Sequence, residues 1–356
     1  MTEIVITMGK IAFVLFCVFN LLYVLLWLER KQSAVMQDRI GANRADIFGL
    51  RAWGLFHPIA DAIKMICKED FMPAAADKFV YTAAPFLAVF FSLVGFAVIP
   101  FGDTLTLGGH TIHLQIADLN VGLLYVFAML SLGVYGFILA GWASNNNFAF
   151  LGGMRAGSQM ISYEITMGAT VMGLVILFQT LSLNQMVQAQ GEYFFGFIPK
   201  WGVLLQPLGF LLFLIAGIAE TKRIPFDLPE GESEIIGYFV EYSGMKFGMF
   251  MMTDFIETIL LSAMLTTLFF GGWQIPYLHA DGFHLGGLRL AINPVLVSFL
   301  QVAAFGLKVF CFCWLLLLIR WTLPRFRYDQ LMALGWKFML PLSLLNLAIT
   351  GLVVLL

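Results

Sequence analysis

Five ionisable residues fall inside stretches of the chain that are otherwise apolar: Glu164, Glu220, Asp254, Glu257 and Lys308. If those stretches cross a membrane, a central charge costs about 2.5 to 3.5 kcal/mol on insertion scales, so it marks a function or a buried partner. Glu220 lies near the end of its stretch and could equally reach water, whereas Lys308 fits that explanation poorly. Glu164 follows two hydroxyl-bearing residues, Ser162 and Tyr163, which favours a place in a polar pathway.

The segment 220–241 concentrates acidic side chains beside two cations, Lys222 and Arg223. The acids are Glu220, Asp227, Glu230, Glu232, Glu234 and Glu241. Like charges in a poorly solvated place raise carboxyl pKa values and share protons, which is typical of a proton relay. The alternative is an ordinary solvated loop, which composition alone favours equally. Apolar residues among the acids, such as Phe226 and Tyr238, favour a packed segment over a solvated one.

A second cluster, 320–329, places Arg320, Arg325 and Arg327 among aromatic residues. Such a basic helix exit can bind lipid headgroups. Together with Arg30 and Arg39, these arginines could instead pair with the acidic segment across one face of the protein. The sequence favours neither interpretation over the other.

These residues must be positioned by helices in a membrane, because 60% of the chain is hydrophobic, 12% is charged and the mean hydropathy is +0.87. The apolar runs have the length of about 20 residues that a spanning helix needs. We predict an all-α integral membrane protein, with residues 1–356 forming one membrane domain. The predicted spans are 11–28, 79–100, 121–142, 159–181, 201–219, 249–271, 294–319 and 335–356.

The distribution of cations predicts the orientation of these eight spans. Sixteen Lys and Arg residues fall in the connections 29–78, 143–158, 220–248 and 320–337, against Lys200 and Arg289 on the other side. By the positive-inside rule the basic side faces the cytoplasm, or its organellar equivalent, and both termini lie on the opposite side. Within the first long loop, residues 53–68 carry isoleucines at helical spacing, which predicts a short amphipathic helix in the interface. The opposite loops, 101–120 and 272–293, are expected to be simple turns.

Several classes of site are absent from the pattern. The chain has no GxGxxG, no P-loop, no cysteine set for an iron-sulfur cluster and no pair of span histidines for haem, so we predict no redox cofactor in this chain. The HxxH of His110 and His113 stands without cysteines, and we assign no metal site there. A net charge of −2 with no basic surface signature gives no support for nucleic-acid binding.

Six stretches together resemble one family, that of the H subunit of bacterial NADH-quinone oxidoreductase, the homologue of mitochondrial complex I subunit 1. They run from the first helix to the last: Glu29–Lys31 with Asp38–Arg44, His57–Asp61 through Lys68–Asp70, Ser162–Glu164, Glu220–Tyr242, Leu268–Trp273, and Pro324–Met332.

The resemblance implies a subunit at the junction of the membrane and peripheral arms, with quinone as a substrate and no permanently bound cofactor. It assigns the quinone passage to Arg30, Arg39, Asp61 and Arg320. It assigns the proton relay to Glu164, Glu220, Glu230, Glu232, Glu234 and Glu241, with Arg223 and Arg325 as basic partners and Asp254 in the sixth helix. No residue is expected to be catalytic in the covalent sense.

The resemblance also implies partners and a location. Flavin mononucleotide and iron-sulfur clusters are expected in partner subunits. These partners are the iron-sulfur and quinone-site subunits of the peripheral arm and the small membrane-arm subunits, besides membrane lipid. The location implied is the bacterial inner membrane, with multiple spans and periplasmic termini.

The sequence departs from the family pattern in two places, the first long loop and the sixth helix. The usual Gly-Pro-Asn-Arg is Gly41-Ala42-Asn43-Arg44 here, and residues 45–52 form a longer stretch, so the first loop is expected to differ in shape. In the sixth helix, Asp254 replaces the usual glutamate, and Glu257 stands where an acid is unusual. We expect the proton path to have shifted locally.

Two other functions remain open from the residues. Related subunits serve membrane-bound hydrogenases and F420 dehydrogenases, although the first-loop and 324–332 stretches favour the quinone enzyme. A secondary cation transporter would also use intramembrane acids, but it predicts paired repeats with broken helices, and the sequence shows no such repeat.

Overall fold

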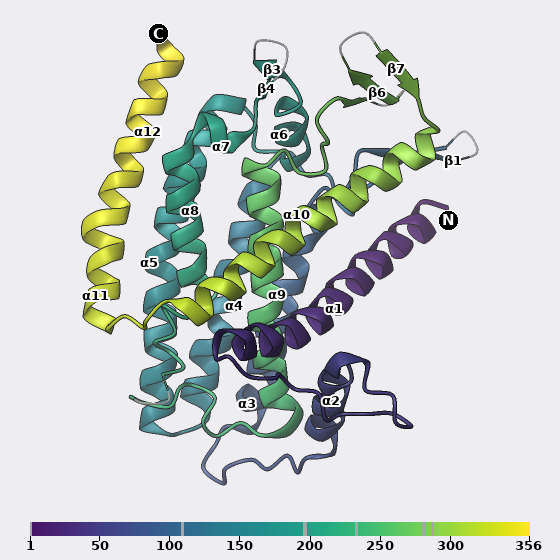
Figure 1. Cartoon of the computed structure of the whole chain (residues 1–356). Helices are drawn as coiled ribbons and strands as arrows, with labels where there is room; N and C mark the ends of the chain where they lie inside the picture. Colours follow the sequence, from purple (N-terminus) through teal and green to yellow (C-terminus); the bar gives the residue numbers. More distant parts are fainter. Residues whose placement is uncertain (1, 108–109, 195–197, 232–233, 280–281, 286–287) are drawn as a thin grey trace.

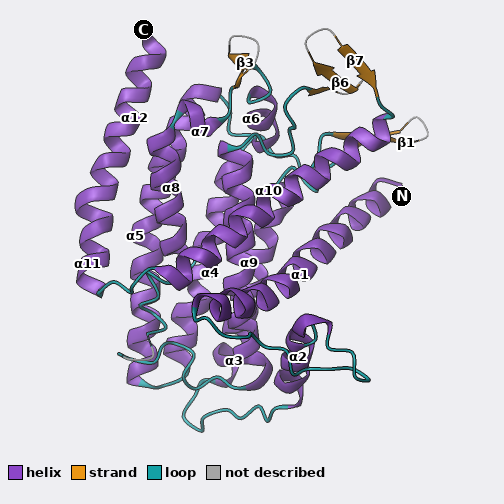
Figure 2. Ribbon diagram, viewed as in Figure 1, coloured by secondary structure: helices purple, strands orange, loops and turns teal. Residues whose placement is uncertain are grey.

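The structure, a computed structural model, describes all residues except 1, 108–109, 195–197, 232–233, 280–281 and 286–287. The described part is dominated by helices that run side by side (Figure 2). The helices are α1 (Thr2–Met36), η1 (Ala52–Gly54), α2 (His57–Cys67), α3 (Lys78–Val94), η2 (Gly95–Val98), α4 (Gly122–Ala143), α5 (Asn147–Phe178), α6 (Leu183–Ala189), α7 (Gly202–Leu205), α8 (Pro207–Glu220), α9 (Gly244–Phe269), α10 (Pro294–Thr322), α11 (Tyr328–Ala333), η3 (Leu334–Met339) and α12 (Leu340–Leu355). The expected fold class, an all-α integral membrane protein, is confirmed.

Seven segments of the described chain form helices long and apolar enough to cross a membrane: α1, α3 with η2, α4, α5, α9, α10, and α11 through α12. The predicted span 201–219 is divided instead into α7 and α8, because Gln206 leaves the helical region (φ −137°, ψ 70°) and Pro207 starts a new helix. With 14 residues, α8 extends about 21 Å, less than a bilayer core.

Helix starts follow local capping chemistry. The Asp77 carboxylate accepts hydrogen bonds from the backbone N–H groups of Phe79 and Val80 at the start of α3. The side chains of Asn146 and Asn293 cap α5 and α10 in the same way, and Pro294 occupies the first position of α10. These side chains satisfy amide groups that the first turn leaves free.

The central helix is α9. In its most apolar stretch 83% of the residues of α9 are buried, whereas the corresponding value is 22% for α1 and 22% for α10. Figure 1 shows α1 and α10 as two long oblique helices crossing in front of the upright ones. A helix surrounded by protein can carry polar side chains that lipid would exclude, and α9 carries Asp254 and Glu257.

The two ends of the bundle differ (Figures 1 and 2). One, here called the loop end, carries α2 and the segments 37–56, 68–77, 221–231 and 234–243. The other, the hairpin end, lies toward both termini and carries short antiparallel strands: β1 (Thr104–Leu107) with β2 (His110–His113), β3 (Tyr193–Phe194) with β4 (Ile198–Pro199), and β5 (Leu278–His279) with β6 (Gly282–Leu285) and β7 (Leu288–Ala291). The loops 101–120 and 272–293, which were expected to be simple turns, thus contain paired strands.

The amphipathic segment forms a helix, but a shorter one than 53–68. Residues 52–54 make a separate turn in which Trp53 has φ 54°, and α2 begins at His57. On α2 the side chains of Ile59, Ile63 and Ile66 are exposed on one face. This face is what a helix lying in a membrane interface presents to lipid.

Candidate functional site

The acidic segment between α8 and α9 is folded into the loop end of the bundle. Phe226, Leu228 and Tyr238 are buried, and the side-chain amide of Gln159 on α5 donates hydrogen bonds to the backbone carbonyls of Ala219 (2.7 Å) and Phe226 (2.9 Å). The expectation that this segment is packed rather than freely solvated is confirmed. Lys222, Arg223 and Asp227 are therefore held at defined positions away from bulk water.

Lys222 lies at the centre of this segment and is fully buried. Its Nζ atom is 2.9 Å from Glu257 Oε2 and 3.5 Å from Asp254 Oδ1, and it lies 3.7 Å above the centre of the Phe137 ring. Burial alone would lower the pKa of Lys222, but the carboxylates of Glu257 and Asp254 raise it to about 12. Lys222 therefore stays protonated and holds two carboxylates of α9 together.

Glu220, the last residue of α8, is 4% exposed. Within the described part of the chain, neither of its carboxyl oxygens has a hydrogen-bond partner. A buried carboxyl group without partners is strongly disfavoured as an anion, so it either carries a proton or meets water. Glu164 on α5 lies within electrostatic range of Glu220, and its own carboxylate accepts a hydrogen bond from the Ser131 hydroxyl of α4.

Two further acids of the segment, Asp227 and Glu230, have raised pKa values. The Tyr238 hydroxyl donates to Glu230 Oε1 at 2.8 Å, yet burial, with the charges of Asp254 and Asp227, raises the pKa of Glu230 well above its usual range. Burial also raises the pKa of Asp227 to about 6, against the opposing effect of Arg325, whose Nη2 is 3.1 Å away. Such groups exchange protons when a nearby charge changes.

The arginines connect this segment to α1. Arg320 Nη1, at the end of α10, lies 2.6 Å from Glu29 Oε1, and Arg223 Nη1 lies 4.0 Å from Glu29 Oε2. The guanidinium of Arg223 stacks 4.1 Å above the Phe255 ring, and burial together with the positive charge of Arg320 lowers its pKa. Arg325 therefore pairs with the acidic segment, at Asp227, whereas Arg320 pairs with Glu29 of α1 and Arg327 with its neighbour Asp329.

A cavity of about 490 Å³ lies between α1, α2 and α9, and Arg30, which follows Glu29 in α1, is part of its lining. Apolar side chains such as Phe19, Met65 and Met252 form most of its wall. At its polar end Arg30 donates a hydrogen bond to Asp61, joining α1 to α2. A mostly apolar cavity with a few convergent polar groups is the common form of a site for a small organic ligand.

Not every predicted site residue joins this cluster. Arg39 is exposed, and its Nε donates to Gln37 Oε1. Glu234 forms a surface ion pair of 2.7 Å with Arg155. The Glu241 carboxylate accepts from the side-chain amide of Asn146 at 2.7 Å, whereas Glu232 lies outside the described residues.

Sequence reasoning did not select Lys222, Asp227 or Glu29 as site residues. A signal existed for two of them, since Lys222 stands two positions after Glu220 and Asp227 lies inside the acidic segment. Glu257 follows Asp254 by three residues, which places both on one helix face. The contact between Glu29 and Arg320 joins opposite ends of the sequence, and no local pattern indicates it.

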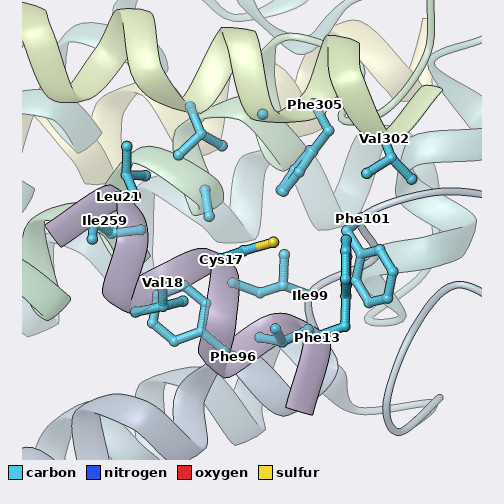
Figure 3. A pocket seen from close by; sticks show the side chains of 14 residues that line it. Phe13, Cys17, Val18, Leu21, Phe96, Ile99, Phe101, Ile259, Val302 and Phe305 are labelled. Carbon is cyan, nitrogen blue, oxygen red and sulfur yellow. The ribbon is translucent and has the colours of Figure 1, made fainter. Parts of the chain in front are cut away.

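A second cavity, shown in Figure 3, lies between α1, α9 and α10 toward the hairpin end and has a volume of about 180 Å³. Phe13, Phe96, Phe101 and Phe305 contribute to a lining that is almost wholly apolar and includes the Cys17 thiol. It contains none of the predicted site residues. It therefore offers space to hydrocarbon rather than a path for protons or charge.

Lys308, the remaining intramembrane charge, has a different environment. Its Nζ donates to the backbone carbonyls of Phe270 (2.8 Å), Gly272 (3.0 Å) and Gln274 (2.7 Å), just beyond the end of α9. Cations near a helix C-terminus satisfy its free carbonyls and favour its dipole. Lys308 thus anchors the central helix at the hairpin end.

This arrangement predicts a loss of stability in Lys308→Met, which keeps the length of the side chain but leaves three carbonyls unpaired. We expect the free energy of unfolding to fall by about 2 kcal/mol or more, the range for a hydrogen-bonded charge whose partners stay buried. Thermal unfolding of the purified protein measures the change. Lys200→Met, which removes a cation from an exposed pair with Glu192, is the matched control and should change little. Equal unfolding temperatures for the two variants would contradict the anchoring role.

Comparison with known proteins identifies relatives along the whole chain. The model of the NADH dehydrogenase family matches residues 9–351. The chain is 44% identical over 357 residues to the second H subunit of NADH-quinone oxidoreductase of Rhizobium meliloti, covering 99% of both chains. It is 44% identical over 329 residues to the first H subunit of the same enzyme of Cytophaga hutchinsonii (92% and 90% covered), and 46% identical over 331 residues to the H subunit of Thermomicrobium roseum (92% and 89%).

Proposed function

The chain belongs to the NADH dehydrogenase family as a membrane subunit of NADH-quinone oxidoreductase, and we propose that its loop end admits the quinone and couples quinone reduction to proton movement. The observation that carries this proposal is the set of ionisable side chains gathered at the loop end. They are the Arg30–Asp61 pair at the cavity, the ion pairs of Glu29 with Arg320 and Arg223, the acids of the acidic segment, and Glu220 with Glu164.

The cavity between α1, α2 and α9 fits a quinone in chemistry and place. A quinone has a polar ring and an apolar tail, and the cavity has one polar end at Arg30 and Asp61 and an apolar wall. Arg30 can donate to a ring carbonyl, while Asp61 orients the guanidinium. The exposed isoleucines of α2 next to it would lie among lipid, from which such a substrate comes.

Quinone reduction and proton movement would be coupled through the change in charge that reduction causes in the cavity. Reduction of a quinone to a quinol consumes two electrons and two protons, so the charge and the proton demand beside Arg30 and Asp61 would change during turnover. Asp227 and Glu230 respond because burial has raised their pKa values. The quinone cavity and Glu220 would thus be linked in free energy, each affecting the other, without a continuous chain of contacts between them.

The remaining assignments rest on family resemblance and on charge distribution. Arg39, Glu232, Glu234 and Glu241 belong to the proposed site on resemblance. Electrons would come from an iron-sulfur cluster in a peripheral-arm subunit, which with the small membrane-arm subunits and lipid forms the surroundings of this chain. The sixteen cations at the loop end favour a cytoplasmic position in a bacterial inner membrane, with both termini periplasmic.

A variant that narrows the cavity tests the quinone proposal. Met252→Trp adds bulk to the wall, and we expect the KM for quinone to rise by about tenfold because a misfitted group costs about 1 to 3 kcal/mol of binding. Steady-state NADH:quinone reductase assays on membranes measure it. Leu345→Trp places the same bulk on an exposed position of α12 and should leave KM unchanged. If KM were the same in both variants, the quinone would have to bind elsewhere.

A further inference from the structure

The first long loop, between α1 and α2, carries an exposed apolar turn. Ile47 and Leu50 pair across it, with Ile47 N donating to Leu50 O at 3.1 Å and Leu50 N donating to Ile47 O at 3.0 Å. The side chain of Phe48 is fully exposed, and those of Leu50 and Trp53 are 65% and 81% exposed. Residues 47–53 are called the loop tip below. So many large apolar side chains together on one surface are typical of a contact with lipid or with another protein.

The backbone of the loop tip indicates that its aromatic side chains have a purpose outside the chain. Phe48 and Gly49 both have positive φ, 51° and 83°, as in the tight hairpin turn that favours Asn-Gly, and Trp53 has φ 54°. Positive φ is rare for bulky residues and costs conformational energy. Because the ring of Phe48 is fully exposed, no contact within the described part of the chain offsets that cost.

The base of the loop is fixed, so this exposure is not that of a loose segment. Ala45 N donates to Nε2 of His57, the first residue of α2, at 3.2 Å. Gly54 (φ 85°) lies so close to Ala42 that any side chain at this position would collide with the Ala42 carbonyl oxygen. The loop tip therefore projects from a defined base.

Two hydrogen bonds set the depth of the loop tip relative to the membrane. The Trp27 Nε1–H donates to Trp53 O at 3.1 Å, and the Tyr23 hydroxyl donates to Leu55 O. Trp27 lies one residue before the end of the predicted first span, 11–28, and tryptophan and tyrosine are enriched at this level of a bilayer. The loop tip is therefore held where α1 leaves the hydrocarbon, at a depth that a water-soluble partner does not reach.

The loop tip also continues the exposed isoleucine face of α2, which follows it in the chain. Figure 1 shows the segment between α1 and α2 extending sideways past α2, at the edge of the molecule. Its apolar side chains can enter the interfacial layer while the charged ones remain among the headgroups. These charged side chains are all exposed: Arg44, Asp46 and Arg51.

We propose that the loop tip is a second membrane anchor, which places Phe48, Leu50 and Trp53 in the interfacial layer of the bilayer and holds α2 beside the cavity. Its ligand is phospholipid. With 11 residues, α2 is shorter than the about 12 to 15 residues below which an isolated helix is marginal in water, so a fixed point just before its start restricts where it lies. The anchor does not depend on what the cavity binds, so it can fail while the proposed function stands.

The test places the photoreactive analogue p-benzoylphenylalanine at position 48 of the assembled enzyme, which is irradiated in its native membranes, digested and examined by mass spectrometry. The excited ketone of the analogue bonds to nearby C–H groups, so the peptide records what lies against residue 48. We expect an adduct with the mass of a phospholipid. The same analogue at Ile40 is the matched control, because Ile40 is equally apolar and exposed. It lies beyond Met36, where α1 ends about 14 Å along the helix from Trp27, and should give no lipid adduct.

The outcomes decide between lipid and protein. A phospholipid adduct at position 48 that is absent at position 40 supports the anchor. A cross-link from position 48 to another subunit would show that a protein covers the loop tip, which overturns the proposal. The proposal is also overturned if position 48 gives no lipid adduct, or if both positions give it in equal yield.

Hydrogen exchange tests whether the loop tip holds α2. Phe48→Asp puts a charge in the interfacial layer, so we expect the backbone amides of residues 57–67 to exchange faster than in the wild type, with the enzyme in lipid nanodiscs. Ile40→Asp is the matched control and should leave this exchange unchanged. Equal exchange in all three proteins would show that α2 is held without the loop tip, and that part of the proposal would be wrong.

Discussion

Replacing Glu220 with glutamine is expected to abolish most proton pumping while the enzyme still assembles. Glutamine has the same size, and Glu220 forms no hydrogen bond or ion pair that the change would break among the described residues. A positioned acid or base contributes about 10²- to 10⁴-fold to proton transfer, so pumping should fall about a hundredfold. Quinone reductase activity should fall with it, because quinone reduction that is tightly coupled to proton transfer cannot turn over faster than the slowed proton step. Proton uptake and NADH oxidation in proteoliposomes measure both.

The matched control is Glu192→Gln, which removes a carboxylate from an exposed ion pair at the hairpin end. Glu234→Gln is an informative second variant, since resemblance assigns Glu234 to the relay while its contact is a surface pair with Arg155. We expect a smaller decrease there than for Glu220, because a partly exposed carboxylate exchanges protons with bulk water. Pumping that stays normal in both Glu220→Gln and Glu234→Gln would remove the relay from the proposed function.

The helices were predictable because hydrophobic length alone selects a spanning segment. Hydropathy could not show which helix is central, since α9 is less apolar than α1 and yet far more buried. Asp254 and Glu257 are polar, which lowers the mean hydropathy of α9. Because lipid excludes such side chains, the same two residues require that α9 be surrounded by protein. Pro207 is a sequence signal for the break between α7 and α8 at Gln206. The break was not predicted because the residues on both sides are apolar, and hydropathy does not distinguish one continuous helix from two.

The candidate site was predictable in composition and less so in geometry. Acids and aromatics alternating over 220–241 indicated a packed segment, and the burial of Tyr238 and Phe226 agrees. Whether an acid lies inside or at the surface depends on the loop path, so Glu230 and Glu234 look equivalent in sequence but have different surroundings. Pairs such as Glu29 with Arg320 arise only when helices pack, which single-sequence patterns do not encode.

Lys222 shows most clearly what a buried charge does to stability in this protein. It is the one cation within 4.0 Å of Glu257 and Asp254 among the described residues, and all three side chains are buried. Removing one partner of a buried pair is costly because the other charge is left in a low-dielectric site. The cation–ring contact with Phe137 would be lost as well.

Lys222→Met is therefore expected to lower the free energy of unfolding by about 3 to 5 kcal/mol, a large part of the stability of a typical protein. The yield of assembled enzyme in membranes should fall, and thermal unfolding of what remains measures the loss. The double variant Lys222→Met with Glu257→Gln removes one of the two unpaired acids, so the effects of the single changes should not add. If Lys222→Met proved no less stable than Lys200→Met, the ion pairs of Lys222 would contribute nothing to the fold. In that case Asp254 and Glu257 would have to be neutral at rest, and their role in the relay would begin from the protonated state.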